Sequence, residues 1–398
     1  MKAHARDLAV LGGAPAFPGL LHVGRPNLGN RDELHRRIDE LWERRWLTND
    51  GELVRELEQR LCDYTGARHC VATSNGTAAL DILVRAAGLT GEVILPSFTF
   101  VGTAHALAWS GLEPVFCDVD PTTHTLDPGR VEELVSDRTS AILGVHLWGA
   151  AHFVDELRSV ATRHSLALFF DAAHAFGARY KGQPVGRLGD AEVFSFHATK
   201  IVNSFEGGAI TTDDDALAAR LRLLRNFGFE DYDRVVDLGT NAKMSEASAA
   251  MGLTSLDALD HFLAANARNL VRYRHRLADV AGVRVVSPDP REGANGHYVV
   301  LEVDPGPGLT RDELQQALWK EGVLARRYFY PGCHAHEPYA TRHADAARHL
   351  PVTEKLVSRV LCLPTGTAVT EGDIDEVCAI LALAQASADV VRRQLGRR

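Results

Sequence analysis

The sequence predicts an α/β protein built on a mostly parallel sheet. Between residues 69 and 212, short apolar runs alternate with amphipathic helical patterns, which is typical of strands joined by crossover helices. Some of these runs, such as residues 140–146, have no polar residue between their two ends, as expected for a strand covered on both faces. Because 398 residues exceed the usual size of one hydrophobic core, we expect two domains.

We place the domain boundary after residue 255. A large domain, 1–255, includes an irregular N-terminal arm, and a smaller α/β domain covers 256–398. Apolar periodicity predicts helices over 31–44, 52–64, 78–87, 153–164, 213–225, 247–259, 262–280, 311–320 and 370–395. The strands are expected at 69–73, 92–96, 113–118, 140–146, 165–170, 191–196, 209–212, 297–303 and 323–326.

Composition excludes several classes of protein. The net charge is −9, from 43 basic and 52 acidic residues, which argues against a general nucleic-acid binder. Six scattered cysteines without a CxxC pair predict free thiols rather than a disulfide framework or a metal site. No secretory signal is visible and no run approaches the roughly 20 apolar residues of a membrane span. We therefore expect a cytoplasmic, soluble protein with no membrane partner.

The stretch 189–212 reads as two strands around a polar turn that contains Lys200. A lysine becomes a nucleophile only where its pKa is lowered and its side chain is held still. A solvated surface lysine would have the same local sequence, so the rest of the chain has to decide.

Polar and aromatic residues follow three other strands. The turn 74–77 joins a strand to a helix, where free N–H groups bind anions, although an ordinary helix cap reads the same. Phe100 is expected either to stack on a flat ring or to pack in the core. Asp171, directly after an apolar strand, needs a partner, either the next turn or a protonated ring nitrogen. Because function in such sheets sits at the carboxyl ends of the strands, we expect these residues to lie near Lys200.

One cofactor, pyridoxal 5′-phosphate, accounts for this combination. Its aldehyde needs a lysine, its phosphate needs N–H groups and hydroxyls, its ring nitrogen needs a carboxylate, and its ring needs an apolar face. The chain offers these groups, in that order, as Lys200; Gly76, Thr77 and Ser195; Asp171; and Phe100.

The chain resembles the DegT/StrS family of sugar-nucleotide aminotransferases, within the aspartate-aminotransferase fold class. The matching segments follow the family's order over about residues 10–340 and include 74–80, 96–100, 171–175, 194–200 and 206–213. The resemblance implies a three-layer fold with a mixed, mostly parallel central sheet. It also implies a homodimer with shared active sites.

The resemblance assigns a role to each site residue. Lys200 binds the cofactor's aldehyde and later moves the proton, Asp171 pairs with the ring nitrogen, and His174 lies near the ring hydroxyl. These three are the expected catalytic residues. Asn241 is expected to reach the cofactor phosphate of a neighbouring subunit, while the phosphate and ring contacts named above complete the cofactor site.

The implied reaction moves an amino group from glutamate to a keto-sugar nucleotide. The segment 206–208 and the form of 195–200 resemble members that aminate C4, so we expect dTDP-4-keto-6-deoxy-D-glucose as acceptor. A C3-aminating enzyme, a non-catalytic regulator with this fold, and a lysine-dependent lyase stay as alternatives. Expected substrate contacts are the cations Arg225, Lys243, Arg326 and Arg327, each alternatively a solvated surface charge. Tyr328 and His334 are also expected to contact the substrate.

Overall fold

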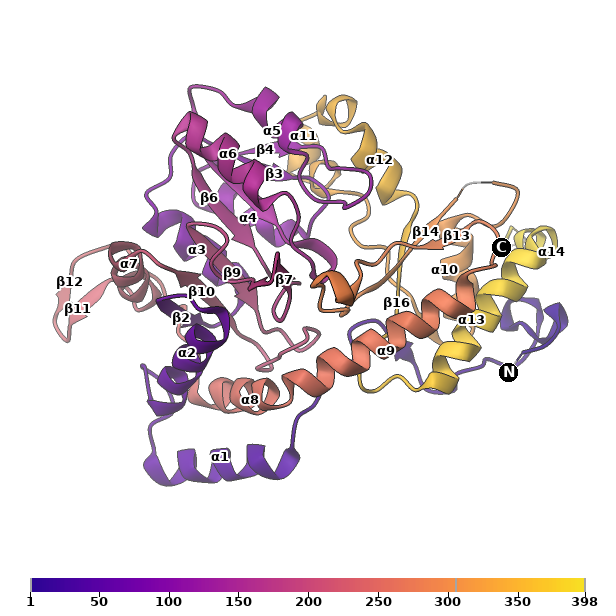
Figure 1. Ribbon diagram of the computed structural model, residues 1–398, viewed down its shortest axis with the longest axis horizontal. Helices are drawn as coiled ribbons and strands as arrows, with labels where there is room; N and C mark the ends of the chain where they lie inside the picture. The colour runs from indigo at the N-terminus through magenta and orange to yellow at the C-terminus, as the bar shows by residue number, and fades with distance from the viewer. Residues whose placement is uncertain (1, 305, 397–398) are drawn as a thin grey trace.

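The computed structural model describes residues 2–304 and 306–396. Its centre is a seven-stranded sheet in the order β2-β10-β9-β6-β5-β3-β4, shown in Figure 1. β10 runs antiparallel to both of its neighbours, and the other pairs are parallel. The strands are β2 (His69–Thr73), β3 (Glu92–Pro96), β4 (Glu113–Cys117), β5 (Thr139–Val145), β6 (Ala167–Asp171), β9 (Ala191–Ser195) and β10 (Gly208–Thr212).

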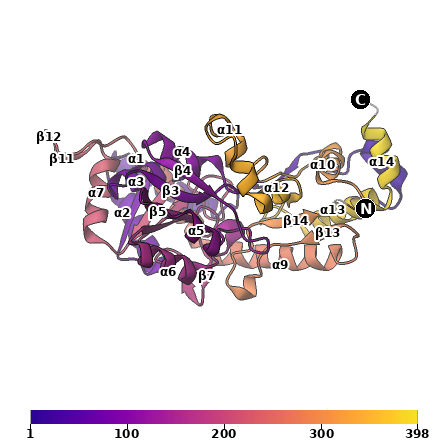
Figure 2. The same cartoon turned by 90° about the horizontal axis from the view of Figure 1, so that it is seen from above.

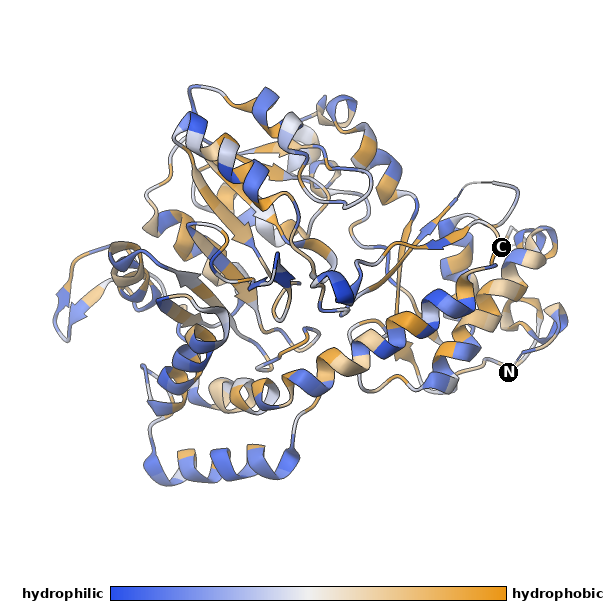
Figure 3. Cartoon of the chain, viewed as in Figure 1, coloured by the Kyte–Doolittle hydropathy of each residue, from blue (hydrophilic) through white to orange (hydrophobic). Residues whose placement is uncertain are grey.

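Helices cover both faces of this sheet because alternate residues of each strand point to opposite sides. In β3, Ile94 packs with one hydrophobic cluster, whereas Val93 and Leu95 pack with another. The first cluster includes α1 (Arg31–Arg44), α2 (Glu52–Thr65), α5 (Pro128–Leu134), α6 (Val154–His164) and α8 (Glu246–Asp257). The second includes α3 (Gly76–Ala86), α4 (Val101–Trp109) and α7 (Asp215–Arg225). The three-layer, mostly parallel fold is therefore confirmed, and Figure 3 shows its apolar strands.

A smaller α/β unit lies beside the large one. Its antiparallel sheet contains β13 (Val283–Val285), β14 (Val299–Val303) and β16 (Val360–Leu363). Its helices are α9 (Leu259–Leu277), α10 (Arg311–Lys320), α13 (Glu371–Ala386) and α14 (Ala388–Leu395). The single helix expected over 370–395 divides into two because Ser387 leaves helical geometry.

The N-terminal arm packs with the small unit, although we expected it with the large domain. β1 (Leu21–His22) pairs in parallel with β15 (Val323–Leu324), and Leu8 and Val10 are buried in the small unit's core. The arm therefore gives β15 its strand partner and adds apolar side chains to the core of the small unit. The helix α9 also belongs to both units, since Phe262 lies in the large core and Leu270 in the small one. The boundary after residue 255 stays a prediction.

Two further segments shape the surface. The hairpin β11 (Phe229–Asp231) and β12 (Arg234–Val235) projects from the large unit, at a place where we expected no strand (Figures 1 and 2). After β15 the chain returns to the large unit through α11 (Tyr339–Arg342) and α12 (Pro351–Val357). There the N–H groups of Val352 and Thr353 donate to the Asp118 carboxylate at 2.9 and 2.8 Å. The small hairpin β7 (Arg179–Tyr180) and β8 (Gln183–Pro184) completes the set of strands.

The described residues form neither a disulfide nor a metal cluster. All six cysteines are free, and five are buried. Within residues 2–304 and 306–396, no three His, Cys, Asp or Glu side chains come together as a metal site, and no helix is long and apolar enough to cross a membrane.

Candidate active site

A cradle of free N–H groups opens helix α3. The Asn75 side chain caps the helix by accepting from the N–H of Ala78 at 2.8 Å. The N–H groups of Gly76 and Thr77 make no hydrogen bond with any residue that the structure describes. Gly208 packs so closely that a Cβ there would lie 2.6 Å from the carbonyl carbon of Asn75. Such a helix start favours an anion such as phosphate.

Ser195, the last residue of β9, borders this cradle. A Cβ on Gly76 would lie 3.1 Å from the Ser195 Cβ and 3.5 Å from its hydroxyl oxygen. The structure thus places Ser195 against Gly76, at the start of the helix whose first N–H groups are free.

Phe100 stands at the edge of the same cradle. Its ring is 59% exposed, whereas Phe98 two residues earlier is fully buried in the core. At Gly102, a Cβ would lie 3.1 Å from the Phe100 ring and 3.2 Å from the Thr77 hydroxyl. The ring and the hydroxyl therefore flank one glycine, and an exposed ring beside an anion site suits stacking on a flat cofactor.

Asp171 ends strand β6 with both carboxylate oxygens engaged. Its Oδ2 accepts from the Thr103 hydroxyl at 2.8 Å, and its Oδ1 accepts from the Ala173 N–H at 3.0 Å. Burial raises the pKa of Asp171, while these two hydrogen bonds and the charge of Lys200 act in the opposite direction. A protonated ring nitrogen would supply the counter-charge that a buried carboxylate requires.

Lys200 lies in the turn after β9. Its backbone N–H donates to the His197 carbonyl at 2.8 Å, and its Nζ is 3.4 Å from the Tyr298 hydroxyl. Burial lowers the pKa of Lys200 to about 8, although the negative charge of Asp171 opposes this shift. About a tenth of the amine is therefore unprotonated at pH 7, far more than for an ordinary lysine, as a nucleophilic lysine requires.

His174 is buried among aromatic rings. It stacks on Tyr298, with ring centres 4.2 Å apart, and on Phe329 at 5.8 Å. Burial lowers the pKa of His174 well below its usual value, and the charge of Lys200 lowers it further, so the ring is neutral. Its Nδ1 is buried without a hydrogen-bond partner among the described residues. Buried polar atoms normally have partners, so this nitrogen fits the ring hydroxyl of the cofactor.

Two neighbours of the catalytic residues are absent from our predictions. Thr103 binds the Asp171 carboxylate. It lies three residues, or about one helical turn, after Phe100, and this spacing could have indicated that both side chains face the site. Tyr298 comes from the start of the small unit's sheet and reaches Lys200 across 98 positions of the chain, so local sequence gave no signal for it.

Asn241 and Lys243 lie beside the cradle. Asn241 is exposed and forms an isolated bridge with Asn226. Lys243 forms another bridge with Thr73, at the end of β2, and its Nζ donates to the Asn226 side chain at 2.9 Å. The segment therefore borders the phosphate site through its backbone.

Two of the expected substrate contacts hold the fold together. Arg225 is buried, and its guanidinium donates to Glu58 at 2.6 Å and to Asp50 at 3.1 Å. His334 is buried and bonded at both ring nitrogens, to the Ser97 hydroxyl at 2.7 Å and to Glu354 at 2.8 Å. Neither side chain is free to meet a substrate in this arrangement.

The other expected contacts lie on the loop after β15. Tyr328 is 6.5 Å from Tyr298, ring centre to ring centre, and the Arg326 guanidinium lies 5.4 Å from the Tyr328 ring. These two residues therefore approach the site. Arg327 instead donates to Asp312 at 3.0 Å.

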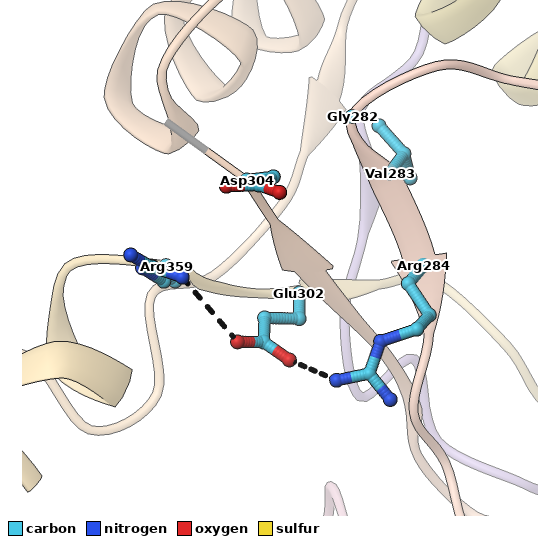
Figure 4. A pocket seen from close by; sticks show the side chains of 6 residues that line it. All are labelled: Gly282, Val283, Arg284, Glu302, Asp304 and Arg359. Carbon is cyan, nitrogen blue, oxygen red and sulfur yellow. Dashed lines mark hydrogen bonds and ion pairs between the residues drawn. The ribbon is translucent and has the colours of Figure 1, made fainter. Parts of the chain in front are cut away.

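An open pocket on the small unit contains none of these residues. It is lined by Gly282, Val283, Arg284, Glu302, Asp304 and Arg359, as Figure 4 shows. Its central carboxylate, Glu302, is paired with Arg284 and with Arg359. The charges inside are largely matched, so the strand ends of the large sheet remain the better site.

Comparisons with known proteins agree with the geometry. The model of the DegT/DnrJ/EryC1/StrS aminotransferase family matches residues 29–382. The dTDP-4-amino-4,6-dideoxy-D-glucose transaminase of Shigella dysenteriae is 37% identical over 86% of this chain and 93% of its own length. The GDP-perosamine synthase of Caulobacter vibrioides is 38% identical, over 91% and 97%.

A solved structure gives the same result. DesI, determined in the presence of its TDP-sugar product, superposes with a TM-score of 0.93 at 53% identity, over 98% of this chain and 99% of its own. With a lysine, a carboxylate and a phosphate cradle at one sheet edge, this chain belongs to the DegT/DnrJ/EryC1/StrS aminotransferase family and is a pyridoxal phosphate-dependent aminotransferase.

Proposed function

We propose that the enzyme transfers an amino group from glutamate to C4 of dTDP-4-keto-6-deoxy-D-glucose. The observation that carries this proposal is the likeness to DesI at 53% identity over nearly the whole chain, since the product of DesI is a TDP-sugar. The name of the Shigella relative specifies the same nucleotide and an amino group at C4. The GDP-linked product of the Caulobacter relative makes the nucleotide the first property to test.

Each residue of the site has a task in this reaction. Gly76, Thr77 and Ser195 hold the phosphate, and Phe100 covers the ring. Asp171 keeps the ring nitrogen protonated. When bound, the cofactor supplies an aldehyde for a covalent bond and a ring that withdraws electrons.

Lys200 performs both chemical roles of the protein. Its Nζ would hold the cofactor through the covalent bond that the aldehyde supplies, and the free amine would take the proton from the donor's α-carbon. His174, neutral and carrying an unpartnered Nδ1, orients the ring through the ring hydroxyl. Arg326 and Tyr328, at the mouth of the site, are the proposed sugar-nucleotide contacts.

The test is a panel of acceptors offered to the holoenzyme after treatment with glutamate. We expect dTDP-4-keto-6-deoxy-D-glucose to restore the absorbance of the lysine-bound cofactor, and mass spectrometry to find the 4-amino sugar. The 3-keto isomer and a GDP-linked 4-keto sugar serve as matched controls. Recovery with the 3-keto isomer would move the proposal to C3, and no response to glutamate or any acceptor would favour a regulatory role.

We also propose a homodimer with shared active sites. Large apolar side chains stand exposed on α1 and on the projecting hairpin segment, including Trp42 at 76%, Tyr232 at 96% and Leu238 at 79%. Such side chains favour a contact with another protein where they gather in one patch. Asn241 follows this segment and is itself exposed, so it is placed to reach a second copy.

Subunit mixing tests the shared site. Neither Lys200→Ala nor Asn241→Ala alone should be fully active. If Asn241 serves the partner's cofactor, a mixed dimer contains one intact site, so mixing the two variants should restore activity. Activity that never exceeds the sum of the two variants would contradict the shared site.

A cytoplasmic location is part of this proposal, because six free thiols suit a reducing compartment.

A further inference from the structure

The segment 295–298 lies against both turns of the active site. It precedes strand β14 of the small unit, and all four of its residues are buried. Its first member, Asn295, donates from Nδ2 to the carbonyl of His174 at 2.8 Å and to that of Phe176 at 2.9 Å. The segment is thereby attached to the turn that follows Asp171.

Asn295 also holds the next part of the segment. Its Oδ1 accepts from the backbone N–H of His297 at 3.0 Å. The backbone of Gly149 comes so close that a Cβ there would lie 1.9 Å from the same oxygen, so no larger residue fits. The backbone of His297 is therefore fixed relative to the His174 turn.

Among the described residues, the imidazole of His297 makes one hydrogen bond, and it is directed at the lysine turn. Its Nε2 lies 2.8 Å from the carbonyl oxygen of Thr199. A carbonyl only accepts, so Nε2 carries the proton. Burial lowers the pKa of His297 to about 4, and the charge of Lys200 adds to this effect, which keeps the ring neutral. Its other nitrogen, Nδ1, is buried without a partner in the parts of the chain that the structure describes.

The bond from His297 completes the anchoring of a single peptide group. The carbonyl of Thr199 and the N–H of Lys200 belong to the same peptide plane. His297 binds the carbonyl side, and the His197 carbonyl accepts from the N–H side at 2.8 Å. The direction in which the Lys200 side chain leaves the backbone is set by this plane.

We propose that His297 is a positioning residue for Lys200. Its Nε2–H holds the Thr199–Lys200 peptide so that Nζ stays in its buried position, 3.4 Å from the Tyr298 hydroxyl. The small unit, through His297 and Asn295, thus sets the geometry of a lysine on the large unit. This inference rests on the role of Lys200 in the proposed function, but its first readout needs neither substrate nor cofactor.

Two amide substitutions separate this role from simple packing. In His297→Gln the amide nitrogen can stand where Nε2 stood and donate to Thr199. In His297→Asn the amide stands near the position of Nδ1 and cannot reach that carbonyl. His297→Leu is a second variant without a donor.

The first measurement is the pH dependence of Lys200 carbamylation by cyanate in the apoenzyme, followed by peptide mass spectrometry. We expect His297→Gln to keep the wild-type midpoint. His297→Asn and His297→Leu should move the midpoint upward by about one pH unit, as Lys200 becomes solvated. In the holoenzyme, these two variants should lose about 100-fold in kcat with little change in KM, as expected for misplacement of a reacting group by about 1 Å.

Three outcomes would overturn the proposal. The first is an unchanged carbamylation midpoint and kcat in His297→Asn and His297→Leu. The second is an equal loss in all three variants, which would mean that the imidazole itself is needed rather than a donor at Nε2. The third is that the variants without a donor fail to fold while His297→Gln is normal, because the hydrogen bond would then be structural. Absence of transaminase activity in the wild type, with these midpoints as expected, would instead contradict only the proposed function.

Discussion

The Thr103 hydroxyl, in the first turn of helix α4, donates a hydrogen bond of 2.8 Å to Oδ2 of Asp171 at the end of strand β6. Together with the Ala173 N–H on Oδ1, it fixes the plane of a carboxylate that is almost fully buried. The orientation of the carboxylate and its charge are thus separate properties, and different substitutions can remove each of them.

Asp171→Asn should abolish most turnover, while Thr103→Val should reduce it less. The asparagine keeps the size of the side chain but removes the charge that stabilises a protonated ring nitrogen, so we expect a loss of about 100-fold or more in kcat. The valine removes one hydrogen bond to a charged group and should cost about tenfold. Steady-state kinetics with glutamate measures both. Equal losses in the two variants would show that orientation, and not charge, is what matters.

The apoenzyme should reveal the depressed pKa of Lys200 directly. Because that pKa is about 8, the amine is mostly protonated below pH 8 and mostly free above it, so cyanate should modify it with a midpoint near pH 8. Asp171→Asn should move this midpoint lower, since the Asp171 charge raises the lysine's pKa. Lys181, whose pKa is raised by Asp155, provides an internal control that reacts only at higher pH. A midpoint for Lys200 at or above that of Lys181 would contradict the desolvated environment.

Gly208→Ala should weaken cofactor binding. The added Cβ would lie 2.6 Å from the Asn75 carbonyl carbon and 2.8 Å from the Gly76 nitrogen, so the cradle has to shift. We expect the dissociation constant for pyridoxal phosphate to rise by about tenfold, or ~1.4 kcal/mol. Gly19→Ala is the matched control, since a Cβ there meets nothing within 4 Å. Fluorescence titration of the apoenzymes measures both, and unchanged binding in Gly208→Ala would exclude this cradle as the phosphate site.

Glu192→Gln should stabilise the protein at high pH. Burial raises the pKa of Glu192 from 4.5 to about 7. The folded state therefore holds this proton more tightly than the unfolded chain does. The stability that follows is fully present below pH 4.5 and is lost as the pH rises through about 7. Glutamine mimics the protonated acid.

The difference in free energy of unfolding between Glu192→Gln and the wild type should therefore shift by about 3 kcal/mol in favour of the variant as the pH rises from 4.5 to 8. Urea unfolding of both proteins at a series of pH values measures this difference. A difference that stays constant over that range would show that Glu192 titrates normally in the folded protein.

The strand ends were predictable, and most contacts between distant segments were not. Asp171 and Lys200 follow apolar runs, and because parallel strands share one edge, their proximity follows from the pattern of the sequence. Arg225 has the same local sequence whether it faces a substrate or a carboxylate. Its partners Glu58 and Asp50 lie 167 and 175 positions away, and no periodicity encodes such a pairing.

Tyr298 illustrates the same limit from the other direction. The sequence around Tyr298 alternates like the start of any strand. The Tyr298 ring nevertheless stacks on His174, and its hydroxyl approaches Lys200. This contact depends on how the small unit folds back on the large one. The hairpin 229–235 was missed for another reason: its strands are short and exposed, so they lack the apolar run that marks a buried strand.

The pairing of β1 with β15 has a consequence for synthesis of the chain on the ribosome. Leu21 pairs with Val323, so β1 has no partner until the much later segment that contains β15 has been translated. The large unit, from α1 to α8, can collapse while the arm is still unattached. The small unit cannot be completed until residues near the C-terminus emerge and the arm joins them. Maturation should therefore end with the attachment of the segment that was made first.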